Sequence, residues 1–546
     1  MSTGRSATSA RRASSRIGTP SGALSPYAPS VSIVLPPLHP RVRAVADLSM
    51  AEVREGAGRH EYDGQVQDLS SDGVARGLAA LGGSDSDGSS APLPDPIEEQ
   101  HLAVHERLAR TTFTTLRAHR TNPLVHLSAL DLSDYERDYA PLADREQARA
   151  AHLAAWPDAV DVAIATLDEV SAPVAVSLRS AVAGLGAALR PEDGELGRRA
   201  EASVARLVAH IDAAAQSGPP DAAIGRAALE ELMTVGELIP FDTTVVAERA
   251  ERERERLHDL LRDGLARLGR TGTSAVEVAA LLADHPTGEE VLEEARELSR
   301  RVVEWTAELE LAPVDGELVV EVSPPARRWA VAMMSWAAPG EPPGPSLYSI
   351  TPPEPTWPAQ EQEQWLCMFS RTTLPVITLH EVAPGHYSHG CALRRCEGDV
   401  RRTLQGLAFC EGWAHYTEEL AVELGFSDDP RLQVGMALEA LCRVVRLECA
   451  IGVHTGAFDV AEATRRFHEH AYIETAGARA EAQRATFDPA YGCYTWGKWA
   501  VLDAREHARA RWGNRFSLPA FHRTLLSLGS PPLGLLRAAV DAAPVP

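Results

Sequence analysis

The sequence predicts a mainly helical protein with one small β-sheet, and three observations support this fold class. Stretches of helix-forming residues with spaced apolar positions fill most of the chain from about residue 97 to residue 311. Two short runs, residues 317–323 and 345–350, are apolar and β-prone and lie between turns rich in Pro and Gly. After Arg371 the helical pattern returns and continues to the end. We expect the two runs to form a small sheet just before a helix that carries a His-Glu pair.

The first part of the chain has the composition of a tail. Residues 1 to about 45 are rich in Ser, Arg, Pro and Ala, and the first acidic residue is Asp47. Without an apolar h-region this is no secretory signal, so we expect a disordered tail or sequence upstream of a start near Met50. Residues 81–96 are a Gly/Ser/Asp/Pro linker that cannot form a core.

The predicted organisation is therefore a disordered tail and linker over 1–95 and a single domain over 96–546, with a helical half over 96–311 and a motif-bearing half over 312–546. In the helical half, residues 248–270 combine dense charge with one apolar stripe, as a solvated helix does. The sequence Thr287-Gly-Glu-Glu290 has the capping-box form and predicts the start of a long helix that runs to Glu310.

Charge and apolar content exclude two classes of partner. The chain of 546 residues carries a net charge of −23, which argues against a nucleic-acid-binding surface. No apolar run of about 18 residues occurs, so we expect no transmembrane helix and no membrane partner. The seven cysteines all lie between Cys367 and Cys493, and none has the C-x-x-C spacing of a cysteine zinc site. We interpret them as reduced thiols and predict a cytoplasmic protein.

The segment of residues 373–389, TLPVITLHEVAPGHYSH, contains the first candidate metal ligands. Its two histidines, His380 and His386, are six positions apart, so they would point to different sides of a straight helix. Pro375 suits a first helical turn, whereas Pro384 cannot continue the same helix undisturbed. We expect a short helix that ends in His-Glu and a break at Pro-Gly that re-aims the second imidazole toward a shared metal. The alternative is a helix that ends there beside two unrelated histidines.

A second motif, FCEGWAHYTEEL, supplies a candidate third ligand. On a helix Glu411, His415 and Glu418 fall at i, i+4 and i+7 and therefore share one face. Catalytic zinc commonly has three protein ligands, such as two histidines and a glutamate, and one open position. We assign Glu411 as the third ligand, and Glu418 and His415 as outer partners, with Glu418 holding an imidazole N–H. The sequence leaves Glu418 open as the ligand instead of Glu411, and a solvated amphipathic helix is the structural alternative.

Two further residues have the chemistry that a metal-dependent hydrolysis needs. Glu381 directly follows the first histidine and would take a proton from the attacking water and pass it to the leaving amine. Tyr494, in FDPAYGCYTWGKWA, would direct its hydroxyl at the developing oxyanion. An aromatic core residue is the alternative for Tyr494.

Substrate-binding candidates are weaker, because structural salt bridges are the commoner role of such side chains. Lys498 is the only lysine among 53 Lys and Arg residues, which suggests a position where arginine does not serve. It lies one helical turn after Tyr494 and would assist it or bind a substrate carboxylate. The other candidates are Tyr348, Arg443, Arg446, His454 and Arg484.

Four motifs in order resemble a bacterial family catalogued as domain of unknown function 885. That family shows H-E-x-x-P-G-H, E-G-W-x-x-Y-x-E, R-x-x-R followed by G-x-H, and an arginine before Y-x-x-G. This chain has HEVAPGH, EGWAHYTE, RVVR with GVH, and Arg484 before YTWG. Two departures concern the substrate side. Ala450-Ile451 stands where the family usually has Asp-Thr, and Pro489-Ala-Tyr-Gly replaces Pro-Gly-Gln-Ala.

The resemblance implies a zinc-peptidase-like fold similar to the carboxypeptidase and oligopeptidase gluzincins, with two helical halves around a deep cleft. It also implies that His380, His386 and Glu411 hold one zinc ion. The leading hypothesis is a zinc-dependent hydrolase that cleaves a peptide or a related small-molecule amide. A His₂-carboxylate set also suits non-haem iron, so a metal-dependent tailoring enzyme is the first alternative. A binding protein that keeps the fold without turnover is the second.

Overall fold

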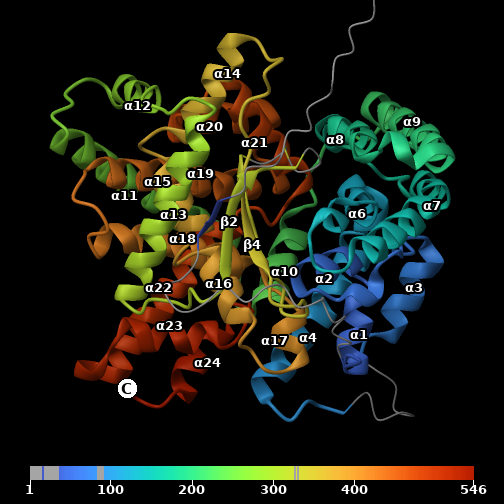
Figure 1. Cartoon of the computed structure of the whole chain (residues 1–546), viewed down its shortest axis with the longest axis horizontal. Coiled ribbons are helices and arrows are strands. Elements are labelled where there is room, and N and C mark those ends of the chain that lie inside the picture. The colour runs from blue at the N-terminus through green and yellow to red at the C-terminus, as the bar shows by residue number, and fades with distance from the viewer. Residues whose placement is uncertain (1–14, 18–35, 83–90, 325–327, 329–330) are drawn as a thin grey trace, which may run out of the picture.

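A computed structural model describes residues 15–17, 36–82, 91–324, 328 and 331–546 of the chain. These residues form a mainly helical structure with one small sheet, as the sequence predicts. In Figure 1 the strands β2 and β4 lie at the centre of the molecule. The helices of the first part of the chain lie to the right of the sheet in this view, and most later helices lie to its left.

The sheet is built around the two runs that the sequence marks as strands. Strand β2 (Glu317–Val322) pairs in parallel with β4 (Pro345–Ile350), so that Val320 lies opposite Tyr348. Strand β3 (Ala332–Ser335) pairs antiparallel with the other edge of β4, and β1 (Ser15–Ile17) pairs antiparallel with β2. The strand order is therefore β1-β2-β4-β3. The predicted small sheet is confirmed.

Residues 36–82 correct the predicted tail. They form three helices, α1 (Pro40–Ala46), α2 (Met50–Ala57) and α3 (Ser71–Ala80). Val42 and Tyr62 have no exposed surface, and the apolar side chains of this segment make a core with Leu102 and with Val400. The predicted tail includes this segment because Ser-, Arg-, Pro- and Ala-rich residues precede it and a linker follows it. Packing against α4 (Pro96–Arg110) and α17 (Asp399–Thr403) completes its core. The predicted linker falls partly on 83–90, outside the described residues.

Helices α6 (Pro123–Ala129), α7 (Leu142–Thr166), α8 (Ala172–Gly184) and α9 (Gly194–Ser217) form a second core around Trp156 and Leu207. Before them in the chain come α4 (Pro96–Arg110), which packs Leu102 into the core of residues 36–82, and α5 (Ala118–Thr121). Pro157 lies inside α7, where its missing N–H costs one helical hydrogen bond. In the described part of the chain, no single helix is long and apolar enough to cross a membrane. One bent pair, Ala172–Ala188 with Pro191–Ser217, meets that test by length and composition only.

The largest core extends from α10 to the end of the chain and surrounds the predicted motifs. Its helices before the sheet are α10 (Arg226–Glu237), α11 (Thr243–Arg267), α12 (Ser274–Leu282) and α13 (Glu290–Glu308). Those after it are α14 (Ala359–Leu366), α15 (Leu374–Glu381), α16 (His386–Leu393), α17 (Asp399–Thr403), α18 (Leu407–Glu423), α19 (Arg431–His454), α20 (Val460–Ala471), α21 (Thr475–Phe487), α22 (Cys493–Trp512), α23 (Leu518–Leu526) and α24 (Leu535–Ala542).

The two predicted charged helices are present as α11 and α13. Thr287 and Glu290 exchange the hydrogen bonds of a capping box. The Thr287 backbone N–H donates to Glu290 Oε2 at 3.0 Å, and the Glu290 N–H donates to Thr287 Oγ1 at 3.4 Å.

Candidate metal centre

The break between the two histidines occurs where the sequence predicts it. Helix α15 ends at Glu381, and α16 begins at His386, so the two imidazoles belong to different helices. Gly385 makes this turn possible, because a Cβ atom there would lie 1.9 Å from the carbonyl oxygen of His380. No larger residue fits without moving the backbone that carries the first histidine. The predicted rebuilding of the helix at Pro-Gly is therefore confirmed.

The turn is held from behind by a residue of the second motif. Trp413 on α18 has no exposed surface, and its indole N–H donates to the carbonyl oxygen of Pro384 at 2.9 Å. Tyr416, one turn later, has its hydroxyl 3.0 Å from His522 Nε2. The aromatic residues of EGWAHY thus anchor α18 to the turn and to α23.

His380, His386 and Glu411 converge. Each offers one ligand atom, and the three atoms lie within 4.8 Å of one another. The Nε2 atoms of both histidines are 3.4 Å from the same oxygen, Glu411 Oε2. The two rings stand at 86° with their centroids 4.7 Å apart. Glu411 is therefore placed as the third member of the set.

Helix α18 carries Glu411 into this position and crosses α22 very closely. A Cβ atom on Gly497 would lie 1.9 Å from the carbonyl oxygen of Ala408, and one on Gly412 would lie 2.4 Å from the Gly497 backbone. The two glycines thus allow the helix backbones to touch. The crossing brings Tyr494, near the start of α22, to the site, where its ring lies 6.4 Å from the His380 ring in a stacked arrangement.

A buried charged network stands behind His380. Glu418 Oε1 lies 2.7 Å from His380 Nδ1 and 3.1 Å from Arg443 Nη2, and Glu418 Oε2 lies 3.0 Å from His415 Nδ1. Burial raises the pKa of Glu418, but the charge of Arg443 and the hydrogen bonds from His380 and His415 outweigh it and hold the pKa well below its usual range. Glu418 is thus an ionised carboxylate that fixes the His380 ring.

The same surroundings set the pKa values of the two histidines. Burial and Lys498 lower the pKa of His415 to about 3, so its ring is neutral near pH 7 and its Nδ1–H donates to Glu418. Burial and Arg443 also lower the pKa of His380, but Glu411 and Glu418 outweigh them and raise it to about 9. The two carboxylates therefore make the Nε2 side of His380 attractive to positive charge.

Different groups stand behind His386. Its Nδ1 atom lies 3.6 Å from the sulfur of buried Cys410, the residue just before Glu411. Trp336, which follows β3, places its ring 6.3 Å from the His386 ring. The Trp336 indole N–H donates to the carbonyl oxygen of Gly56 on α2 at 3.1 Å. Sequence reasoning missed both residues. Adjacency to Glu411 was a usable signal for Cys410, whereas nothing local marks Trp336.

The two predicted catalytic side chains remain available. Glu381 ends α15 directly after His380, and its carboxylate makes no hydrogen bond or ion pair with the described residues. Burial and the nearby charge of Glu411 raise the pKa of Tyr494, while Arg484 and Arg446 oppose that effect only in part. Tyr494 therefore keeps its phenolic proton near neutral pH and is a hydrogen-bond donor.

The three predicted arginines already have carboxylate partners. Arg443 binds Glu418 and also Glu439, at 3.0 Å. Arg446 makes two hydrogen bonds to Glu481, at 2.6 and 2.8 Å, and its guanidinium carbon lies 5.2 Å from the Tyr494 ring centroid. Arg484 pairs with Asp488 at 2.9 Å. Arg443 thus supports Glu418, and Arg446 supports Tyr494 from behind.

Three predicted substrate contacts are buried instead. Tyr348 on β4 has no exposed surface, and its hydroxyl lies 3.4 Å from Thr378 Oγ1 of α15. Lys498 also has no exposed surface, and its ammonium lies 2.5 Å from Glu419 Oε2 and 3.9 Å from Glu253 Oε1. His454, at the end of α19, is 1% exposed, and burial lowers its pKa to about 4. The substrate-binding role of these three stays a prediction. Each faces the core because its helix or strand is covered on that side.

Comparison with known proteins places the chain in a family but leaves its activity open. The family described as "Bacterial protein of unknown function (DUF885)" matches residues 52–540. The chain belongs to this family. No curated protein matches the sequence. The predicted family is thus confirmed.

Two solved structures share the fold. A "putative lipoprotein of unknown function" from Shewanella oneidensis is 18% identical, with a TM-score of 0.73 over 91% of this chain and 97% of that one. A "putative lipoprotein" from Colwellia psychrerythraea is 16% identical, with a TM-score of 0.74 over 92% of this chain and 97% of that one. At these identities the likeness concerns the fold alone.

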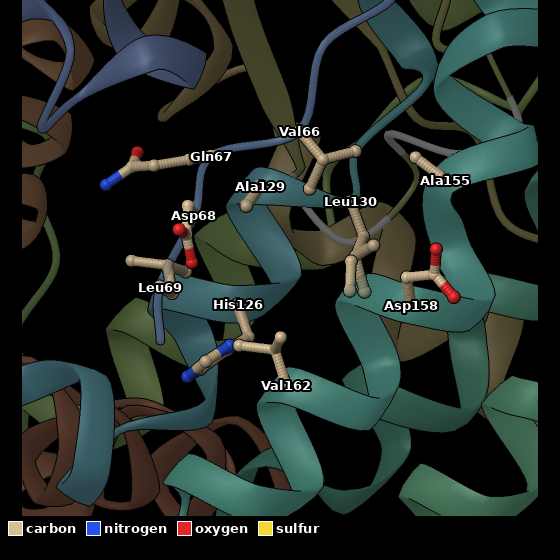
Figure 2. A pocket seen from close by; sticks show the side chains of 11 residues that line it. Val66, Gln67, Asp68, Leu69, His126, Ala129, Leu130, Ala155, Asp158 and Val162 are labelled. Atoms are coloured by element: carbon tan, nitrogen blue, oxygen red, sulfur yellow. The ribbon is translucent and has the colours of Figure 1, made fainter. Parts of the chain in front are cut away.

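A cavity of about 180 Å³ lies between α6, α7 and residues 66–69. The residues that line it are distant in the sequence from His380, His386 and Glu411. Figure 2 shows part of its lining, with His126 and Ala129 on α6 and Asp158 and Val162 on α7. The His126 ring is already bonded to the carbonyl oxygen of His119 at 2.8 Å. No residue of the metal centre lines this cavity.

Proposed function

We propose that this protein is a zinc-dependent hydrolase that cleaves a peptide bond or a related amide. The convergence of His380, His386 and Glu411 within 4.8 Å carries the proposal. Three supporting groups have the chemistry that such a reaction needs, namely an unpaired carboxylate at Glu381, a protonated phenol at Tyr494 and an ionised Glu418 behind one ligand.

The residues present fit a divalent metal ion. Glu411 Oε2 is buried, makes no hydrogen bond within the described part of the chain, and has the Nε2 atoms of both histidines at 3.4 Å, so a cation held by these three atoms would offset the cost of burying its charge. Two imidazoles and one carboxylate, with room for a further ligand, are a donor set of catalytic zinc sites. His380 is held from the far side by a carboxylate, as metal-bound histidines usually are.

A bound zinc ion would supply Lewis-acid chemistry and lower the pKa of water toward about 7. The chain's own residues have separate tasks. Glu381 takes a proton from the attacking water and returns it to the leaving amine, a task for which its carboxylate is free because no described residue bonds to it. Tyr494 donates its hydroxyl proton in a hydrogen bond to the oxyanion that forms on the substrate. Arg446, whose guanidinium carbon lies 5.2 Å from the centroid of the Tyr494 ring, keeps that ring in place.

The relation to the gluzincin carboxypeptidases and oligopeptidases belongs to the same proposal, as does a substrate cleft between two helical halves. It is supported by the placement of the ligands on helices α15, α16 and α18 beside a small sheet. The predicted cytoplasmic location and the absence of nucleic-acid and membrane partners stay predictions. The substrate class is a peptide or a small-molecule amide.

Elemental analysis of the purified protein, followed by digestion of a peptide library, tests the proposal. We expect about one equivalent of zinc per chain, as for other single-ion sites, and cleavage that a chelator abolishes and added zinc restores. Absence of any bound metal, together with no affinity for added zinc, would remove the proposal.

Non-haem iron is the alternative that the same ligand set allows, because two histidines and one carboxylate also bind Fe(II) in oxygenases. Iron in the purified protein, with oxygen uptake and no amide cleavage, would favour a tailoring enzyme of small-molecule metabolism. Bound zinc with no turnover on any amide would favour a binding protein.

A further inference from the structure

The two candidate ligand histidines have the same geometry toward Glu411 but different contacts on the opposite ring nitrogen. Both Nε2 atoms lie 3.4 Å from Glu411 Oε2. On the other side of each ring, His380 Nδ1 faces Glu418 Oε1 at 2.7 Å, and His386 Nδ1 faces Cys410 Sγ at 3.6 Å. A histidine that binds a metal through Nε2 must carry its proton on Nδ1, and that N–H needs an acceptor.

Cys410 is the only such acceptor for His386 within the described residues. Its side chain is 8% exposed and lies on α18, so the helix that supplies Glu411 also supplies the contact to His386. The sulfur of a thiol is a weak but polarizable hydrogen-bond acceptor.

We propose that Cys410 is the positioning residue of His386, accepting the Nδ1–H hydrogen bond that orients the ring's Nε2 toward the metal. This inference rests on the proposed metal site and adds a residue to it. In consequence, residues 410, 411 and 418 of one helix supply a ligand and the outer contacts of both histidines. Helix α18 thereby fixes all three ligands, and His386 has the weaker of the two outer contacts.

The test compares metal binding by Cys410→Val, Cys410→Ala and Cys410→Ser in the full-length chain. Valine and alanine both remove the acceptor and are apolar, valine with more volume than cysteine and alanine with less, so a loss that both share is not a packing effect. Serine keeps an acceptor. Cys449→Val is the matched control, because Cys449 is fully buried on α19 and the only hydrogen bond of its sulfur among the described residues is to the Ala463 carbonyl oxygen, at 4.0 Å.

Zinc affinity is measured by competition with a chelator, and the visible spectrum of the Co(II)-loaded protein reports ligand geometry. We expect Cys410→Val and Cys410→Ala to bind zinc about tenfold more weakly and to shift the Co(II) bands, as loss of an outer partner does. Cys410→Ser should recover most of the affinity, and Cys449→Val should bind zinc as the wild type does. Circular dichroism establishes that each variant is folded before its affinity is compared.

Two results separate this inference from the proposed function. Wild-type affinity and an unchanged Co(II) spectrum in Cys410→Val would overturn the role of the sulfur and leave the metal site intact. A serine variant as weak as the valine variant would overturn it too, because packing and not hydrogen bonding would then explain the loss. A wild-type protein that binds neither zinc nor cobalt would instead overturn the metal site itself.

Discussion

The surroundings of His380 and of His386 differ although both rings meet Glu411 at the same distance. Behind His380 stands an ionised and fully buried carboxylate, Glu418, which is held by Arg443 and His415. Behind His386 stand a thiol and the Trp336 indole. Charge fixes the first ring, whereas packing and a weak hydrogen bond fix the second.

The surroundings of the two histidines differ because the residues behind each ring come from different parts of the chain. The network behind His380 is contained within α15, α18 and α19, which share the largest core. The support of His386 reaches further, because Trp336 is tied to Gly56, and Gly340 of the same loop donates to the Ala57 carbonyl oxygen at 2.9 Å. The N-terminal helices thus contribute to one ligand and not to the other.

Removing either histidine should have the largest effect, because each one supplies one of the three candidate metal ligands. His380→Ala and His386→Ala should each lose about one equivalent of bound zinc, since two protein ligands rarely retain a catalytic ion. Elemental analysis after dialysis measures this loss. His210→Ala is the control, because this ring lies on α9 and its only hydrogen bond within the described part of the chain is to the carbonyl oxygen of Leu167, at 2.8 Å. Full metal content in the His386 variant would show that the two rings do not share one ion.

Glu381→Gln should separate metal binding from catalysis, because it should lower turnover without lowering zinc content. The amide cannot take up a proton, so we expect turnover to fall by about 10²–10⁴-fold with zinc content unchanged. Single-turnover kinetics on a cleaved library peptide, with metal content measured on the same sample, check both halves of this expectation. Turnover within a few-fold of the wild type would assign the proton transfer to another group.

Glu418→Gln tests how much the negative charge behind His380 contributes to stability and to zinc affinity. It keeps a hydrogen bond to His380 but leaves Arg443 with Glu439 alone, so unfolding free energy should fall by about 3 kcal/mol. Zinc affinity should fall by about 10–100-fold. Denaturant titration and chelator competition measure the two quantities. Cys410→Val should lose less in both assays, because it removes no charge, and an equal or larger loss there would contradict the asymmetry.

The smallest effect concerns the link between the N-terminal helices and the Trp336 loop. His60 Nε2 lies 3.2 Å from Glu341 Oε1, its Nδ1 lies 3.3 Å from Asp63 Oδ1, and its ring stacks on Tyr139. Burial lowers the pKa of His60, but the hydrogen bonds to Asp63 and Glu341 outweigh it and raise the pKa to about 9.

A folded-state pKa above the unfolded value of about 6.5 means that protonation of His60 stabilises the fold below that pH. This contribution is lost as the pH rises through about 9. The stability difference between wild type and His60→Gln should therefore be larger at pH 6 than at pH 9.5, by no more than about 3 kcal/mol. Denaturant titrations at the two pH values measure it. A difference that does not change with pH would show that the ring is neutral in the folded protein.

Part of the site was predictable because it depends on neighbours in the chain. Pro384 and Gly385 required a break between the two histidines, and the structure has it. The helical spacing of Glu411 and Glu418 placed both on one face, but it could not decide which one meets the imidazoles. That choice depends on the crossing of α18 with α15, which puts Glu411 beside the Nε2 atoms and Glu418 behind His380.

Other predictions failed because they were made from composition, which does not reveal how distant segments pack together. The predicted tail included residues 36–82 because a Ser/Arg/Pro/Ala-rich stretch precedes them and a linker follows, yet they form helices whose core α4 and α17 complete. The isolated lysine suggested a special role, and the structure gives it one as a fully buried cation between Glu419 and Glu253. A compact ammonium fits where a guanidinium would need more acceptors.

The sequence by itself determined the helical fold class, the small sheet, the family and the two histidines separated by a turn. Each of these follows from residue type and from spacing along a few turns of chain. Only the tertiary structure decided that Glu411 joins the histidines, that Cys410 and Trp336 stand behind one of them, and that Tyr348, Lys498 and His454 are buried. Those facts depend on which helix faces cross, and this is a property of packing between segments that are distant in the chain.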